Sequence, residues 1–285
     1  MKLIQPNADI YIPDNLTDNE RFRRTTHLGI GAHQDDLEFM ALHGILECFQ
    51  RENRWFGGVT CTDGAGSSRS GPYAEYSDEA MKAVRMKEQQ AAAQIGQYSF
   101  MAQLAHPSSA AKEAAQRSVL VDDLEILLKA TRPDVVYTHN PFDKHATHVG
   151  VLLAVIEAIG RLPRDERPER LFGCEVWRGL DWLPDESKVV HPLDAHPNLA
   201  AALNGVFDSQ ITGGKRYDLA VEGRRRANAT FFDSHSVDNA QRVAYAVDLT
   251  DLPELGVQGL NPFCSGLLEA FRASVMDNLP ESTDH

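Results

Sequence analysis

Short apolar runs alternate with longer segments of helical period along the first 165 residues. Three runs bounded by polar or turn residues predict buried strands at 28–32, 58–62 and 134–138. Between and after these strands, apolar side chains recur every three or four residues, which predicts helices at 38–51, 81–95, 120–128 and 152–159. Because parallel strands need helical crossovers, this order predicts a Rossmann-like α/β fold, with a mostly parallel sheet and helices on both faces.

The alternation loosens beyond about residue 163. A strand is predicted at 173–177 and helices at 198–207 and 214–231, but the pattern does not fix their arrangement. We therefore predict an N-terminal extension over 1–24 and a catalytic core over 25–165. Residues 166–285 are predicted to form a smaller C-terminal α+β elaboration that completes the same domain.

The net charge of −13, from 41 acidic and 28 basic residues, disfavours nucleic acid and anionic membranes as partners. Neither a signal-like segment nor a run of ~20 apolar residues is present, so a cytoplasmic protein acting on a small molecule is expected. The basic run 224–226 is interpreted as a solvated helix face. The four cysteines lie far apart without Cys-x-x-Cys pairing, which predicts buried thiols rather than disulfides or a thiolate zinc site.

Two polar clusters follow predicted strands. His33, Asp35 and Asp36 come after the first strand, and His145 and His148 come after the strand at 134–138. Ligands of open α/β sheets bind outside the carboxyl ends of strands, where the strand order reverses, so neighbouring strands would bring both clusters to one crevice. Imidazole and carboxylate suit Zn²⁺, which typically takes three protein ligands at a catalytic site. Spacing alone leaves open which aspartate and which second histidine are ligands.

The first cluster, Ala-His-Gln-Asp-Asp-Leu-Glu at 32–38, resembles the Ala-His-Pro-Asp-Asp-Glu signature of the PIG-L/LmbE-like deacetylases. The second resembles the paired-histidine signature, His-x-x-His, of the same family. The resemblance implies removal of an acetyl group from an N-acetylated amino sugar. It also implies zinc ligation by His33, Asp36 and His148, with Asp35 as general base and His145 stabilising the oxyanion or protonating the leaving amine. Such a donor set also accepts Fe²⁺, and related proteins often form trimers or hexamers.

The resemblance covers roughly residues 26–160 and includes weaker motifs, Thr62-Asp63-Gly64 and Arg85-x-x-Glu88. It implies that Arg85 contacts sugar hydroxyls, although Arg85 and Glu88 at helical spacing also fit a surface ion pair. The loop 63–71 lacks the motifs of a phosphate cradle. We interpret this loop as a substrate rim, with Asp63 and Arg69 as substrate-binding residues.

Two departures from the family pattern matter for the site. Gln34 replaces the usual proline, and Thr147 stands where many members have an aspartate that orients the acid histidine. Asp143 is the predicted substitute for that aspartate. The other histidines, including His139 and His235, are assigned structural roles. The alternatives are an amidase acting on a thiol conjugate or an acylated natural product, and a non-catalytic sugar-binding or metal-binding relative.

Overall fold

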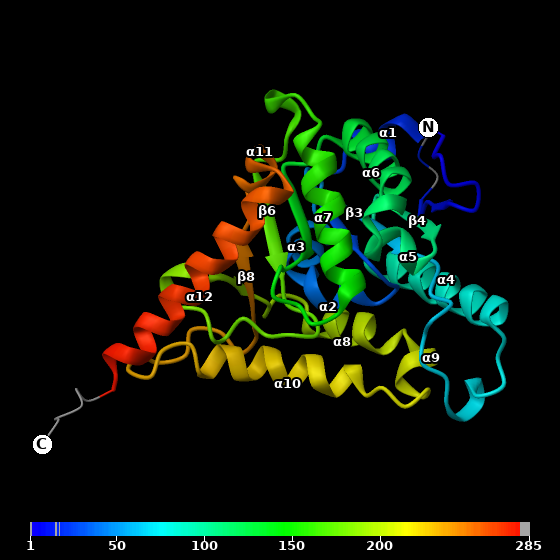
Figure 1. The fold of residues 1–285 in the computed structure, drawn as a ribbon. Helices are drawn as coiled ribbons and strands as arrows, with labels where there is room; N and C mark the ends of the chain where they lie inside the picture. Colours follow the sequence, from blue (N-terminus) through cyan, green and yellow to red (C-terminus); the bar gives the residue numbers. More distant parts are fainter. Residues whose placement is uncertain (1, 15, 17, 280–285) are drawn as a thin grey trace, which may run out of the picture.

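The computed structural model describes residues 2–14, 16 and 18–279, which form a single eight-stranded sheet covered by helices (Figure 1). The strand order is β1-β4-β3-β2-β5-β6-β8-β7. Strands β2 to β6 are parallel, and β1, β8 and β7 join antiparallel at the two edges. The strands are β1 (Asp9–Tyr11), β2 (His27–Gly31), β3 (Phe56–Thr62), β4 (Phe100–His106), β5 (Val135–His139), β6 (Arg170–Cys174), β7 (Val189–Pro192) and β8 (Val243–Asp248).

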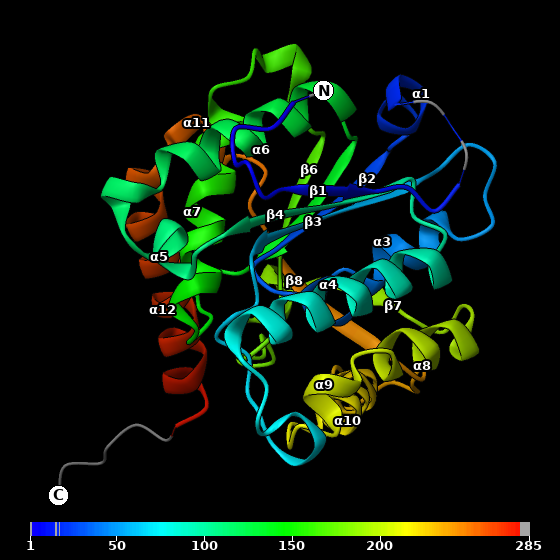
Figure 2. The same ribbon diagram turned by 90° about the vertical axis from the view of Figure 1, so that its right-hand side faces the viewer.

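Helices cover both faces of the sheet, which confirms the predicted Rossmann-like arrangement (Figure 2). One face carries α1 (Asp18–Arg23), α5 (Ser108–Lys112), α6 (Ser118–Thr131), α7 (Ala146–Gly160), α11 (Leu252–Leu255) and α12 (Leu260–Asp277). The other carries α2 (Asp36–Met40), α3 (Leu42–Cys48), α4 (Asp78–Ile95), α8 (Pro197–Gly205), α9 (Asp208–Ile211) and α10 (Tyr217–Thr230).

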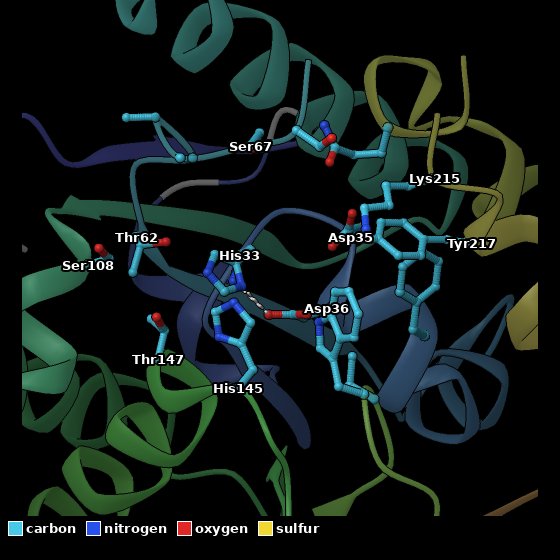
Figure 3. A pocket seen from close by; sticks show the side chains of 18 of the residues that line it. His33, Asp35, Asp36, Thr62, Ser67, Ser108, His145, Thr147, Lys215 and Tyr217 are labelled. Atoms are coloured by element: carbon cyan, nitrogen blue, oxygen red, sulfur yellow. Dashed lines mark hydrogen bonds and ion pairs between the residues drawn. The ribbon is translucent and has the colours of Figure 1, made fainter. Parts of the chain in front are cut away.

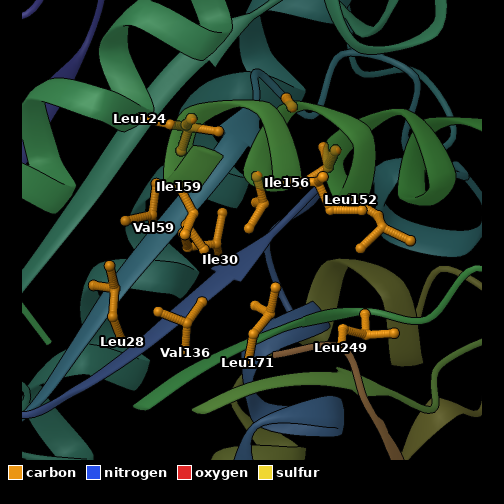
Figure 4. Close-up of a cluster of buried hydrophobic side chains, with 14 of the residues drawn as sticks. Leu28, Ile30, Val59, Leu124, Val136, Leu152, Ile156, Ile159, Leu171 and Leu249 are labelled. Carbon is orange, nitrogen blue, oxygen red and sulfur yellow. The ribbon is translucent and has the colours of Figure 1, made fainter. Parts of the chain in front are cut away.

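A hydrophobic core lies between the sheet and helices α6 and α7. Leu28 and Ile30 of β2 point toward these helices and pack with Ile156 and Ile159 of α7 (Figure 4). All four are buried, and each such side chain stabilises the fold by roughly 1.5–3 kcal/mol. On the opposite face of β2, a Cβ at Gly31 would lie 3.0 Å from the Cβ of Asp36, so glycine lets α2 begin directly against the strand.

Several elements differ from the sequence prediction. The helix predicted over 38–51 is two helices, interrupted at Ala41, whose φ of −106° and ψ of 16° leave the helical region. Strands β1, β4, β7 and β8 and helix α12 were not predicted. All four cysteines are free thiols; Cys48, Cys61 and Cys174 are buried as expected, and Cys264 is half-buried.

Candidate active site

The two polar segments that follow β2 and β5 meet at one point of the sheet. β2 and β5 are parallel neighbours where the strand order reverses, so their carboxyl ends open into the same crevice. His33 and Asp35 lie between β2 and α2, and His145 directly precedes α7. Figure 3 shows His33, Asp36 and His145 gathered there. The adjacency expected from the sequence is confirmed.

The side chains of His33, Asp36 and His148 lie close together. The Nδ1 atom of His33 lies 3.1 Å from Nε2 of His148 and 3.3 Å from Oδ2 of Asp36. Nε2 of His148 lies 3.4 Å from Oδ1 of Asp36. Ligands 2.0–2.2 Å from a tetrahedral zinc ion stand roughly 3.3–3.6 Å apart. The three side chains converge at distances close to this range, with Oδ2 of Asp36 facing His33 and Oδ1 facing His148.

A buried carboxylate orients His148. Its Nδ1 lies 3.2 Å from Oδ2 of Asp143, which places the ring proton on Nδ1 and leaves the Nε2 lone pair facing His33 and Asp36. Burial lowers the pKa of His148 to about 4, so the ring is in the neutral form that binds a metal. Asp143 was expected to orient His145. That expectation is wrong, because the only group of His145 that binds Asp143 is its backbone N–H, at 3.0 Å, and the imidazole ring does not.

Asp36 stays ionised inside the protein. Burial opposes ionisation, but the imidazoles of His148 and His139 and a hydrogen bond from His33 outweigh it, and they hold the pKa of Asp36 well below its usual range. The Oδ2 atom also accepts the backbone N–H of His33 at 2.7 Å. The first residue of α2 therefore offers a carboxylate to the site.

Two groups of three possible metal ligands occur among the described residues, and both include His148. One uses His139, which was assigned a structural role. Its Nε2 accepts the backbone N–H of Ala32 at 2.9 Å, so that lone pair is already occupied. The other group, His33, His145 and His148, offers no carboxylate to balance the charge of a divalent cation. The predicted ligands His33, Asp36 and His148 are drawn from these two groups.

Asp35 adopts a left-handed backbone conformation, with φ of 92°, that is uncommon outside glycine. Its backbone N–H donates to Oε1 of Gln89 at 3.1 Å, and its carboxylate accepts a bond from Arg85 at 2.8 Å. Burial raises the pKa of Asp35 to about 6, although Arg85 opposes the shift. A carboxylate with a pKa closer to neutral is a better proton acceptor for catalysis.

Arg85 lies behind Asp35 rather than at the cavity surface. Its side chain is only 2% exposed and donates to Asp35, to the backbone oxygen of Gln34 and, at 3.2 Å, to Glu88. Glu88 also accepts the backbone N–H and the hydroxyl of Ser209, at 2.6 and 2.7 Å. Arg85 and Glu88 therefore form a buried ion pair, and the interpretation as a surface ion pair is wrong. Arg85, expected to contact sugar hydroxyls, instead supports Asp35.

Ring packing, rather than a carboxylate, holds His145. Its ring centre lies 4.5 Å from that of His148 and 4.9 Å from that of His33. Within the described residues, its buried Nδ1 has no hydrogen-bond partner, and Thr147 beside it is buried. Burial and the neighbouring His33 lower the pKa of His145, so it presents a neutral imidazole to the cavity.

His33, Asp35, Asp36 and His145 line a cavity of about 730 Å³. Asp63 lies in its wall, with Lys82 Nζ 3.1 Å from its carboxylate. Arg69 is not among the lining residues. It donates to the backbone oxygen of Ala65 and to Asp78, so it braces the rim loop from outside.

The C-terminal part of the chain supplies a wall that sequence reasoning missed. Phe39, Tyr217 and Trp177 form a row, with ring centres 5.7 Å apart between the first two and 5.9 Å between the last two. Lys215 and Arg224 also line the cavity. A signal was available for Trp177, because it follows β6 and the strand-end rule applies to β6 as well.

The basic run 224–226 is not the solvated helix face that was expected. Arg225 is buried and donates to the backbone oxygens of Glu38 and Phe39, at 2.8 and 3.1 Å. Arg224 is half-buried in the cavity wall, and only Arg226 is exposed. His235 lies in an exposed loop away from the cavity lining, as assumed.

The mostly parallel sheet with helices on both faces defines a Rossmann-like protein. Its histidine and aspartate side chains lie where the strand order reverses and form a candidate metal centre beside the cavity. Residues 28–159 match the family model described as PIG-L, GlcNAc-PI de-N-acetylase. These residues carry the PIG-L domain, whose description is that of a deacetylase acting on a non-peptide C–N bond. The match covers just under half of the chain and includes every predicted metal ligand. No curated protein matches the chain.

Solved structures share the fold. The conserved protein TT1542 from Thermus thermophilus has a TM-score of 0.59 at 21% identity, covering 79% of this chain and 94% of that one. The 4-carboxy-2-hydroxymuconate hydratase GalB from Pseudomonas putida has a TM-score of 0.59 at 17% identity, covering 79% and 96%. The N,N'-diacetylchitobiose deacetylase from Pyrococcus horikoshii has a TM-score of 0.58 at 16% identity, covering 84% and 88%.

At these identities the comparisons establish the fold alone, and one of the matched proteins is a hydratase. The reaction must therefore be argued from the side chains of the site. Within the described part of the chain, no helix combines the length and the apolar character needed to cross a membrane.

Proposed function

We propose that the protein is a zinc-dependent deacetylase that removes the acetyl group from an N-acetylated amino sugar of the N-acetylglucosamine type. The observation that carries this proposal is the convergence of donors from His33, Asp36 and His148 at 3.1–3.4 Å beside Asp35. Zn²⁺ held there would polarise the acyl carbonyl and lower the pKa of a water molecule. Fe²⁺ or another divalent cation would fit the same donors.

Asp35 acts as the general base. Its carboxylate takes a proton from the attacking water, and Arg85 and Gln89 keep it in position. The same carboxyl then returns the proton to the departing amine, so Asp35 ends the cycle ionised. A positioned acid or base of this kind contributes about 10²–10⁴-fold in rate.

His145 stabilises the oxyanion. Its neutral ring donates an N–H hydrogen bond to the oxygen of the tetrahedral intermediate, because a low pKa suits a hydrogen-bond donor better than a proton donor. Removal of one oxyanion-hole donor typically costs ~10²–10³-fold in kcat. The leaving-group role suggested by the family resemblance therefore falls to Asp35.

The cavity wall suits a sugar. The row of Phe39, Tyr217 and Trp177 offers apolar faces for a pyranose ring, and Asp63 offers an acceptor for its hydroxyls. The deacetylase from Pyrococcus horikoshii is named for an N-acetylated sugar, as is the family model.

Acetate release from a panel of N-acetylated sugars tests the function. Zinc-loaded protein is expected to release acetate from at least one of them, and chelation should abolish the activity. Asp35→Asn should keep its zinc content and lose activity ~10²–10⁴-fold. Undiminished acetate release by this variant would refute the assigned base.

The alternatives differ in substrate or in activity. An amidase on a thiol conjugate or an acylated natural product would use the same residues, and adding such amides to the panel separates these substrates. A non-catalytic relative would bind a sugar without releasing acetate. A cytoplasmic location and assembly into trimers or hexamers stay predictions, and light scattering on the purified protein tests the assembly.

A further inference from the structure

Asp35 stands at the N-cap of α2 without capping the helix. An N-cap aspartate normally turns its carboxylate back to accept a backbone N–H of the first helical turn. The carboxylate of Asp35 makes no such bond, because its backbone is in the left-handed region, with φ of 92° and ψ of −28°. The side chain lines the cavity instead and accepts a bond from Arg85. The capping conformation therefore competes with the conformation that the proposed reaction uses.

Glu38 is the third residue of α2, the position from which a glutamate completes a capping box. In a capping box, this side chain accepts the backbone N–H of the N-cap residue. Here the side chain of Gln89, from α4, lies between the two groups. Its Oε1 accepts the backbone N–H of Asp35 at 3.1 Å, and its Nε2 donates to Oε1 of Glu38 at 2.9 Å. Glu38 therefore reaches the Asp35 backbone through one amide group.

Glu38 determines which way the Gln89 amide faces. A carboxylate oxygen accepts hydrogen bonds, so Glu38 binds the NH₂ end of Gln89 and leaves the amide oxygen facing Asp35. The hydroxyl of Tyr98 donates to the same Oε1 of Glu38 at 2.7 Å. Glu38, Gln89 and Tyr98 are all buried, so water does not compete for these bonds. In the opposite orientation, the NH₂ group of Gln89 would face the N–H of Asp35, and two donors would meet.

This arrangement is not the one that would stabilise the fold most. Oε2 of Glu38 is buried and, within the described residues, has no hydrogen-bond partner. An unpartnered buried polar atom costs free energy, and so does a left-handed backbone at a residue other than glycine. Both costs fall beside Asp35. Such local conflicts are typical of functional sites, where positioning takes precedence over stability.

We propose that Glu38 is a positioning residue: together with Tyr98 it orients Gln89, which holds Asp35 in the left-handed conformation with its carboxylate directed into the cavity. The inference rests on the proposed deacetylase function, because it concerns the base of that reaction. Arg85 holds the carboxylate of Asp35, whereas Glu38 acts on its backbone through Gln89. Without Glu38 the Gln89 amide is free to turn, and Asp35 relaxes to cap α2.

Acetate release by zinc-loaded variants tests the proposal. Glu38→Leu should lower kcat about 10²-fold, as a misplaced base does, and change KM by less than about twofold. Glu38→Gln should stay within about threefold of the wild type, because its side-chain oxygen can still accept from Tyr98 and Gln89. Asp123→Leu removes a buried, hydrogen-bonded carboxylate from α6 and is the matched control. It should change kcat by less than about twofold.

Gln89→Leu breaks the same chain of bonds without altering α2, and it should lower kcat as much as Glu38→Leu does. The double variant should lose no more than either single variant, because both changes break one chain. Losses that multiply would show that Glu38 acts independently of Gln89 and would overturn the proposal. Should Glu38→Leu not fold, Tyr98→Phe, which frees the same carboxylate, takes its place beside Gln89→Leu. An unchanged kcat in both variants then counts against the proposal.

The backbone of Asp35 provides a readout that does not depend on activity. Crystal structures of Glu38→Leu and Gln89→Leu should show Asp35 with a negative φ and its carboxylate bound to a backbone N–H of the first turn of α2. Glu38→Gln should keep the left-handed conformation. If the wild type releases no acetate from any N-acetylated sugar, the deacetylase function fails separately, and this comparison decides the inference. An Asp35 that stays left-handed in both of the first two variants overturns it.

Discussion

The side chains of the site are oriented by neighbouring residues that have no proposed part in the reaction. Asp143 orients His148, and Arg85 and Gln89 hold Asp35 in its left-handed conformation. At the family's proline position, the side-chain amide of Gln34 donates to the backbone oxygen of Thr62 at 3.3 Å and to Gln103 at 3.2 Å. These bonds replace the stiffness that a proline ring gives to the loop.

Asp143→Ala should weaken zinc binding about 10–100-fold, because the His148 ring loses the partner that fixes its tautomer and orientation. A competition titration with a chromophoric chelator measures the affinity. Asp122→Ala, on the exposed surface of α6, is the matched control. Equal affinities in the two variants would show that His148 needs no carboxylate.

The sequence predicts the meeting of His33, Asp36 and His148 because two local motifs follow strands that become neighbours. It does not predict that Asp143 selects His148 over His145, because both histidines lie within five residues and only the turn geometry separates them. The burial of Arg85 is likewise a tertiary effect. It depends on Asp35 and on Glu88, which binds α9.

Among the elements, α10 supports α2 through one buried side chain. Arg225 donates to the backbone oxygens of Glu38 and Phe39, near the end of α2, where carbonyls lack partners within the helix. A cation at a helix C-terminus is also favourable for the helix dipole. The C-terminal part of the chain thereby fixes the helix that begins at Asp36.

Arg225→Met should lower the free energy of unfolding by about 2 kcal/mol, because two buried carbonyl oxygens lose their charged donor. The urea midpoint should fall without a change in slope. Arg226→Gln, one residue along the same helix, removes an exposed charge and should change stability by less than about 0.5 kcal/mol. Similar midpoints for both variants would contradict the supporting role of Arg225.

Strands β2, β3 and β5 could be predicted because apolar runs ending in polar residues identify buried parallel strands. β4 was missed, since buried polar residues such as Gln103 and His106 interrupt its apolar run. β7 and β8 pair with each other antiparallel at the sheet edge. An antiparallel pair does not require a crossover helix, so the strand–helix alternation that identifies the rest of the sheet gives no signal for this pair.

For the molecule as a whole, buried neutral histidines predict loss of stability in acid. Burial lowers the pKa of His27 to about 4 and that of His191 to about 3, and it also lowers the pKa of His43. Below the unfolded pKa of ~6.5, the unfolded chain binds protons that the folded chain does not. The free energy of unfolding therefore falls as pH drops from about 6.5 toward 4, by up to about 3 kcal/mol for His27 alone.

Urea unfolding between pH 4 and 7.5 measures this effect, and His191→Gln isolates one contribution. The variant should lose less stability than the wild type on acidification, because a glutamine gains no proton. Glu38, whose pKa burial raises to about 7, acts in the opposite direction above pH ~4.5, but it is common to both proteins. Parallel pH curves would show that the His191 ring does not resist protonation.

The sheet takes strands from all three predicted segments, from β1 at Asp9–Tyr11 to β8 at Val243–Asp248. The part of the chain that matches the family model carries the candidate metal centre, and the C-terminal part supplies one wall of the cavity. The candidate metal centre could be predicted from the sequence because its residues belong to two short motifs. Sequence reasoning missed the cavity wall because Trp177, Lys215 and Arg224 come together only through the packing of α10 against β8, the neighbour of β6.

The most direct test of the account is the position of the metal. Anomalous diffraction from zinc-loaded crystals should show one peak about 2.0–2.2 Å from His33 Nδ1, a carboxylate oxygen of Asp36 and His148 Nε2. A peak bound by His139 or His145 in place of His33, or no peak in the cavity at full zinc loading, would contradict the central claim.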